Sequence, residues 1–105
     1  MGGMYRMQDL LKIVAGEGAD ELRLEPGRPP VMLSRGKVRV VDGGLVTNED
    51  VEELFGSIAT EEQTRELAQC GDIHFILVTE QLTRFKVSAA IDADHLNVTA
   101  INLSR

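Results

Sequence analysis

The chain has 105 residues, of which 43% are hydrophobic and 27% are charged, and its formal net charge is −6 at pH 7. These values predict one small globular domain over residues 1–105 rather than a disordered tail. The negative charge and the scarcity of aromatic residues, with no Trp, argue against a nucleic acid as partner. No apolar run approaches the roughly 18 residues of a membrane span, so we expect no membrane insertion.

Cysteine usage and the N-terminus bear on the compartment. Cys70 is the only cysteine, so no disulfide can form within the chain and a reducing environment is favoured. Residues 1–6 lack the apolar core of a signal peptide. We therefore expect the protein in the cytoplasm.

The first half of the chain predicts one helix and three strands. Apolar residues recur at the spacing of one helical face over 7–16. Leucines alternate with charged residues over 20–25, which predicts a strand that a Pro-Gly turn ends. Two short strands are predicted near 31–35 and 37–41, with a glycine between them.

Two helix starts follow these strands. Thr47 is expected to cap a helix whose first turn is acidic. Thr60 and Gln63 have the spacing of a capping box, which begins a helix that Gly71 can end. Because the second helix has little apolar surface beyond Leu67, we expect it to lie largely exposed.

The last third of the chain predicts a β-meander. Residues 73–79 are apolar apart from His74, so we expect that strand to be buried on both faces. A turn at 92–95 precedes a final strand at 96–103. The strand between them, at 83–91, alternates and presents one apolar face, made of Phe85, Val87, Ala89 and Ile91. This order of elements predicts an α+β fold, in which about three helices flank an antiparallel sheet of about six strands.

Motifs for catalysis are missing from the sequence. No GxxxxGK(S/T) segment occurs, so a nucleoside triphosphate cannot be bound in the P-loop manner. Cys70 is expected at a helix C-terminus, where the helix dipole disfavours a thiolate, and His74 lies on another element. His74 and His95 do not have the spacing of metal ligands. We therefore expect neither an enzyme nor a metal or cofactor site.

Two groups of basic residues are candidates for binding a protein partner. One group surrounds the predicted hairpin at 31–41. The other group consists of Arg84 and Lys86 on the strand at 83–91, which share a face of the strand with Ser88. Each group is either an ordinary solvated surface or a docking surface for an acidic partner, and the residues alone leave both open. The candidate partner-binding residues are Arg28, Arg35, Lys37, Arg84 and Lys86.

Three segments of the chain match the motifs of one known family. They are Gly18-Ala-Asp-Glu-Leu-Arg-Leu-Glu-Pro-Gly-Arg-Pro-Pro30, Asp72-Ile-His-Phe75 and Arg84-Phe-Lys-Val-Ser88. In this order and spacing they resemble the N-terminal domain of type IV pilus retraction (PilT-type, twitching-motility) ATPases. The resemblance implies a PAS-like fold that sits on the neighbouring subunit's ATPase domain in a hexameric ring. It also implies that Arg84 and Lys86 occupy positions that face the nucleotide bound next door.

The chain departs from the family pattern at several positions. Arg23 stands where the family has His, and Ser88 stands where it has Asn. The family's "Q.RG" segment is replaced by Asp92-Ala-Asp94-His95, and an aspartate there would repel a phosphate that an arginine would bind. We therefore expect the contribution to a neighbour's ATP site to be lost. The sequence stops where the family's ATPase domain would begin, which suggests an accessory domain without its motor.

These observations predict a non-catalytic interaction module, an adaptor or regulator that binds a protein of type IV pilus, secretion or motility machinery. The partner is expected to be a pilus or secretion ATPase or a motility regulator. Two alternatives stay open. One is a PAS-like sensor of a small molecule, which needs an internal cavity. The other is a structural homodimer that pairs through a sheet edge such as the strand at 96–103.

Overall fold

The structure, a computed structural model, describes residues 5–41 and 43–104. Most of the N-terminal segment considered above therefore lies outside the described residues. The elements in chain order are α1 (Met7–Gly16), β1 (Glu21–Leu24), β2 (Val31–Ser34), β3 (Lys37–Val40), α2 (Asn48–Gly56), α3 (Glu61–Cys70), β4 (Asp72–Val78), β5 (Arg84–Asp92) and β6 (His95–Asn102).

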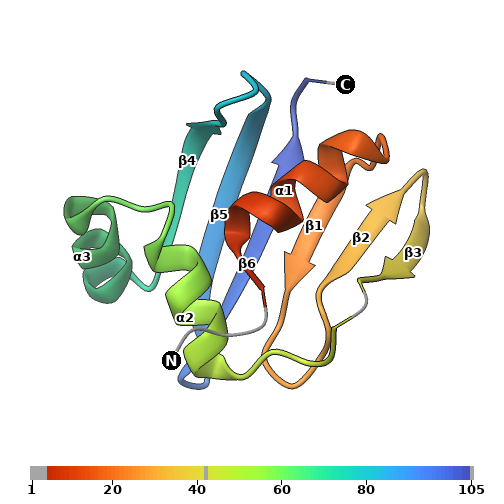
Figure 1. Ribbon diagram of the computed structural model, residues 1–105. Coiled ribbons are helices and arrows are strands. Elements are labelled where there is room, and N and C mark those ends of the chain that lie inside the picture. Colours follow the sequence, from red (N-terminus) through yellow and green to blue (C-terminus); the bar gives the residue numbers. More distant parts are fainter. Residues whose placement is uncertain (1–4, 42, 105) are drawn as a thin grey trace.

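The six strands form one antiparallel sheet in the order β3-β2-β1-β6-β5-β4. Helices α1 and α2 lie against one face of this sheet, and α3 lies beside β4 (Figure 1). The predicted α+β class, with about six strands and three helices, is confirmed. Because β6 pairs with both β1 and β5, it has no free edge. The example given for the alternative of a sheet-edge homodimer, pairing through residues 96–103, is therefore wrong.

The core lies between the sheet and the helices. Every second residue of the central strands points into it, as the alternation in the sequence predicts. The apolar stripe of α1 covers these residues. The side chains that are at most 2% exposed include Leu10, Val14, Leu22, Leu24, Val51, Phe85, Val87 and Val98.

Strand β4 differs from the prediction. The apolar run at 73–79 was expected to be buried on both faces, but β4 is an edge strand. Ile73 is buried, whereas Ile76 and Val78 are 55% and 51% exposed. The helices cover one face of the sheet, so alternate residues of β4 point into solvent even though they are apolar. Ile91, which was predicted on the same apolar face as Phe85, is also 44% exposed because it lies at the far end of β5.

Local capping and turn signals gave the correct element ends. Thr47 and Thr60 both form capping boxes, with Asp50 and Gln63 respectively. Helix α3 ends at Gly71, whose φ of 85° is left-handed. The β5–β6 turn consists of Ala93 and Asp94, whose φ angles are 51° and 65°. Two consecutive positive φ angles are what a tight two-residue hairpin turn requires.

The position of Phe85 allows the core to be tested. Its side chain is 0% exposed, so Phe85→Ala removes a large apolar group and leaves a cavity. We expect the free energy of unfolding to fall by about 3–5 kcal/mol in urea titrations. Leu45→Ala, at a side chain that is 59% exposed, should change it by less than about 0.5 kcal/mol. Equal losses in both variants would contradict this description of the core.

The stability of α3 should depend on its cap. Leu67 is the one buried residue within this fully described helix. Thr60 Oγ1 accepts a hydrogen bond from the Gln63 amide at 3.1 Å. Thr60→Ala should therefore cost about 1 kcal/mol and raise amide hydrogen exchange within α3. Thr64→Ala, which replaces an exposed residue of the same helix without touching the cap, should leave exchange unchanged or slower.

Candidate docking surface on the open face of the sheet

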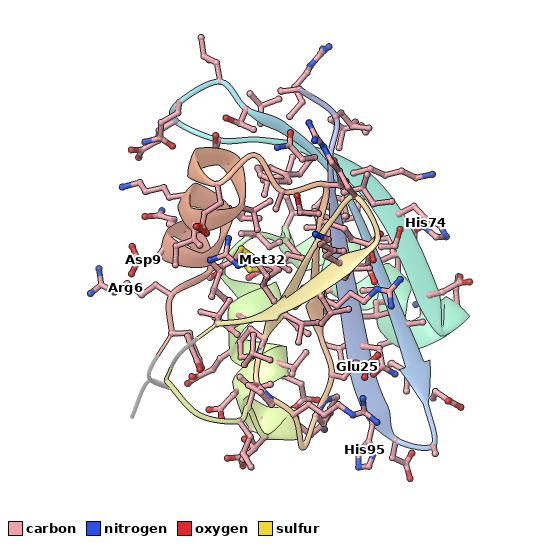
Figure 2. The ribbon with its side chains drawn as sticks, turned by 90° about the vertical axis from the view of Figure 1, so that its right-hand side faces the viewer. Arg6, Asp9, Glu25, Met32, His74 and His95 are labelled. Atoms are coloured by element: carbon pink, nitrogen blue, oxygen red, sulfur yellow. The ribbon has the colours of Figure 1, made fainter. Side chains whose placement is uncertain are left out.

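None of the described helices covers the second face of the sheet, which we call the open face (Figure 1 and Figure 2). Figure 2 views the molecule from the side of β3 and shows the helices on one side of the sheet and His74 pointing to the other. The strand register aligns two complete rows of side chains across this open face. The first row is Val38, Leu33, Glu21, Ile101, Lys86 and Ile76. The second row is Val40, Val31, Arg23, Thr99, Ser88 and His74.

The open face contains two polar pairs, one along β1 and one between β5 and the edge strand β4. Arg23 forms an ion pair with Glu21 on the same strand. His74 Nδ1 and Ser88 Oγ lie 2.8 Å apart, on strands that pair directly at these two residues. Sequence reasoning missed both pairs as contacts. The His74–Ser88 pair depends on a register between residues 14 positions apart, for which the sequence carries no signal.

Arg84 and Lys86 lie together on this face, as predicted. Lys86 stands between Ile76 on β4 and Ile101 on β6, and Arg84 stands opposite Val78. Neither cation takes part in an ion pair among the described residues. We call Ile76, Val78, Arg84, Lys86 and Ile101 the basic–apolar patch.

The other predicted partner-binding residues do not join this patch. Arg28 lies in the β1–β2 turn, and its Nε is 3.7 Å from Oε2 of Glu25. Arg35 and Lys37 lie at the opposite end of β2, where the Arg35 amide donates to an Asp20 carboxylate oxygen at 2.9 Å. Lys37 pairs with Ser34, so alternation places it on the helix side of the sheet. The hairpin cations are therefore separated along the strand and between the two faces.

Candidates for metal or thiol chemistry remain apart. Cys70 is the last residue of α3 and is exposed, while His74 forms a hydrogen bond with Ser88. Over residues 5–41 and 43–104, no group of three or more His, Cys, Asp or Glu side chains is placed to hold a metal ion. The helices in the same ranges are all too short or too polar to cross a bilayer.

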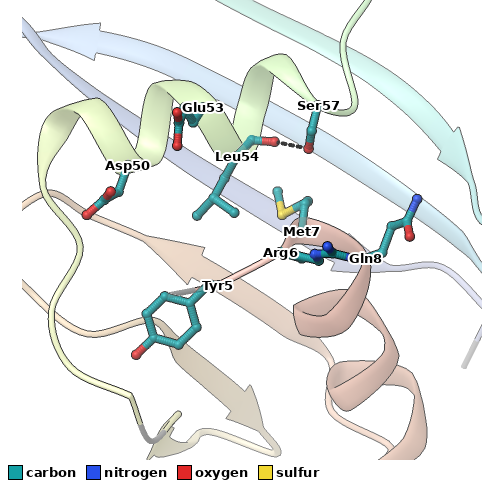
Figure 3. A pocket seen from close by; sticks show the side chains of 8 residues that line it. All are labelled: Tyr5, Arg6, Met7, Gln8, Asp50, Glu53, Leu54 and Ser57. Atoms are coloured by element: carbon teal, nitrogen blue, oxygen red, sulfur yellow. Dashed lines mark hydrogen bonds between the residues drawn. The ribbon is translucent and has the colours of Figure 1, made fainter. Parts of the chain in front are cut away.

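A hollow with a volume of about 560 Å³ lies between the first turn of α1 and α2 (Figure 3). Three of its six polar side chains already have partners within the fold. Tyr5 donates to the Gly44 carbonyl at 2.5 Å, and Ser57 Oγ donates to the Leu54 carbonyl at 2.7 Å. Asp50 belongs to the α2 capping box. Half of the polar side chains that line the hollow are thus engaged within the fold and do not point to a particular small ligand.

Comparisons with known proteins relate this fold to ATPases. No protein-family model matches the chain. It is 28% identical to the type IV pilus ATPase PilU of Pseudomonas aeruginosa over 82 residues, which are 78% of this chain and 22% of PilU. A crystal structure of the pilus retraction motor PilT with bound ADP matches 92% of the chain with a TM-score of 0.84 and 20% identity. The ATPase DotB of Legionella pneumophila matches 97% with a TM-score of 0.75 and 16% identity.

The chain spans only a part of each of these proteins. It covers 29% of the PilT chain and 30% of the DotB chain. The shared fold thus belongs to one domain of a longer protein in each case. The resemblance to PilT-type ATPases that the sequence predicts is confirmed, and its extent is consistent with their N-terminal domain.

Proposed function

We propose that this domain is a non-catalytic protein-binding module, an adaptor or regulator that docks on a component of type IV pilus or secretion machinery. The observation that carries the proposal is the open sheet face with its basic–apolar patch. The similarity to PilU and PilT supports the choice of machinery. A pilus retraction ATPase is the first partner to test.

The composition of the patch favours an acidic protein surface as its partner. Arg84 and Lys86 form no ion pair within residues 5–41 and 43–104, so a partner protein can supply a carboxylate without breaking one there. Ile76 and Val78 add apolar area beside them, each more than half exposed. A specific protein interface has an apolar centre and a polar rim, and the patch offers both kinds of side chain.

We expect the chain to lack the family's contact with a neighbour's nucleotide, but this does not prevent the basic–apolar patch from binding a protein. Asp92 lies at the opposite end of β5 from Arg84, eight residues along one strand. This separation is about 26 Å at the rise of an extended strand. The aspartates that would repel a phosphate are therefore far from the basic–apolar patch, which can still contact a protein.

The His74–Ser88 pair does not support an enzyme. In a serine hydrolase the histidine is oriented by a third group, and backbone amides stabilise the oxyanion. Within residues 5–41 and 43–104, His74 has no hydrogen bond besides the one to Ser88. Both residues lie on paired strands, whose amides serve the sheet rather than a substrate.

A double charge reversal tests the proposal. Arg84→Glu with Lys86→Glu should weaken binding to the purified retraction ATPase of the same organism at least tenfold, measured by isothermal titration calorimetry. Because neither cation forms an ion pair among the described residues, the free energy of unfolding should change by less than about 0.5 kcal/mol. A folded double variant that binds with undiminished affinity would remove this patch as the docking surface.

A matched control uses the cations that lie elsewhere. Arg28→Glu with Lys37→Glu makes the same change in net charge at the β1–β2 turn and on the helix side of β3. Binding through the basic–apolar patch predicts near-normal affinity for this variant. An equal loss in both double variants would show that binding follows net charge and not a specific surface.

A further inference from the structure

A second surface lies on the helix side of the sheet, away from the open face. It is a groove between α2, α3 and the β5–β6 turn, with a volume of about 360 Å³. Phe55, Leu67 and Leu96 are buried at its base, each at most 5% exposed. Ile91 also lines it and is 44% exposed. The base of the groove is thus closed by buried side chains, and Ile91 offers apolar area that the chain leaves open.

Small residues keep the groove open. Gly56 on α2 and Thr64 and Ala68 on α3 line its walls. A Cβ atom added to Gly56 would meet no atom within 4 Å, which shows free space at this wall. Ile91, near the end of β5, lines the same groove. A side chain from another molecule can enter the groove.

The groove lies within the most acidic part of the molecule. Residues 48–70, which contain α2 and α3, have seven acidic residues and one basic residue, a net charge of −6 that equals the charge of the whole chain. Glu52 and Asp94 line the groove itself. Neither carboxylate forms an ion pair among the described residues. An occupant with an apolar centre and basic flanks would match both the shape and the charge.

Two contacts hold the walls of the groove in place. Asn48, at the start of α2, accepts a hydrogen bond from the Leu96 amide at 2.8 Å and donates to the Asp94 carbonyl at 3.4 Å. At the other wall, the Ile91 amide donates to the Gly71 carbonyl, directly after α3, at 2.8 Å. A groove whose walls are already fixed loses little conformational entropy when it binds.

We propose that this groove binds a basic amphipathic helix of a partner protein, with apolar side chains against Ile91 and Ala68 and cations beside Glu52 and Asp94. Recognition of this kind uses apolar anchors at i, i+3, i+4 and i+7 of a helix. The inference goes beyond the proposed function, because it concerns a different surface and a partner of opposite charge. Failure at one surface leaves the other unaffected.

The test uses three synthetic peptides and the ¹⁵N-labelled chain. The first peptide is an amphipathic helix of leucine and lysine, the second has the same composition in scrambled order, and the third has glutamate in place of lysine. We expect the first peptide to shift the amide resonances of Gly56, Thr64, Ala68 and Ile91, and the third to shift none. The scrambled peptide should bind at least tenfold more weakly than the first.

Variants separate groove binding from general attraction between opposite charges. Ile91→Glu makes the chain more acidic, yet it should weaken binding of the first peptide at least tenfold because it places a charge among the apolar anchors. Val38→Glu makes the same charge change at a 62% exposed valine on the open face and should not weaken binding. Glu52→Gln with Asp94→Asn should lower the affinity several-fold and reduce its salt dependence.

Three results would overturn the proposal. They are equal binding of the ordered and scrambled peptides, an unchanged or higher affinity in Ile91→Glu, and resonance shifts that lie outside the groove. Each would mean that the acidic helices attract cations without forming a specific site. Binding of the retraction ATPase through the basic–apolar patch would remain possible in every one of these cases.

Discussion

The helices of this domain cover one face of a six-stranded sheet and leave the other face in solvent. Because side chains alternate along a strand, this arrangement divides every strand into a buried set and an exposed set. On β1, Leu22 and Leu24 point into the core. The alternate residues Glu21 and Arg23 form an ion pair on the open face. A one-residue shift in register would exchange the two sets. Both the core and the proposed docking surface therefore depend on the same register.

Features that are decided within a few residues could be predicted from the sequence. The caps at Thr47 and Thr60 and the helix end at Gly71 each depend on neighbours at most four positions away. The order of strands is decided by contacts between distant segments, and there the sequence was a weaker guide. An apolar run such as 73–79 has the same composition in a central strand and in an edge strand. Its place at the edge follows only from the complete sheet.

The candidate site shows the same division. Alternation within one strand was enough to place Arg84 and Lys86 on a common face. It could not show that Arg28 and Lys37, although close in sequence, lie at opposite ends of β2. Nor could it show that Asn48 bonds to Leu96, because that contact joins residues 48 positions apart. Sequence reasoning considered the acidic first turn of α2 as a capping feature only, and so missed the groove beside it.

Strand β5 connects the two proposed surfaces. Arg84 and Lys86 lie at its start on the open face, and Ile91 lies near its end on the helix side. The strand is paired with β4 and β6 along its length, so it cannot bend freely between the two sites. Seven residues separate Arg84 from Ile91, or about 23 Å at the rise of an extended strand. A domain built in this way can hold an acidic and a basic partner at a fixed spacing, which is a property that an adaptor requires and that a catalytic site does not.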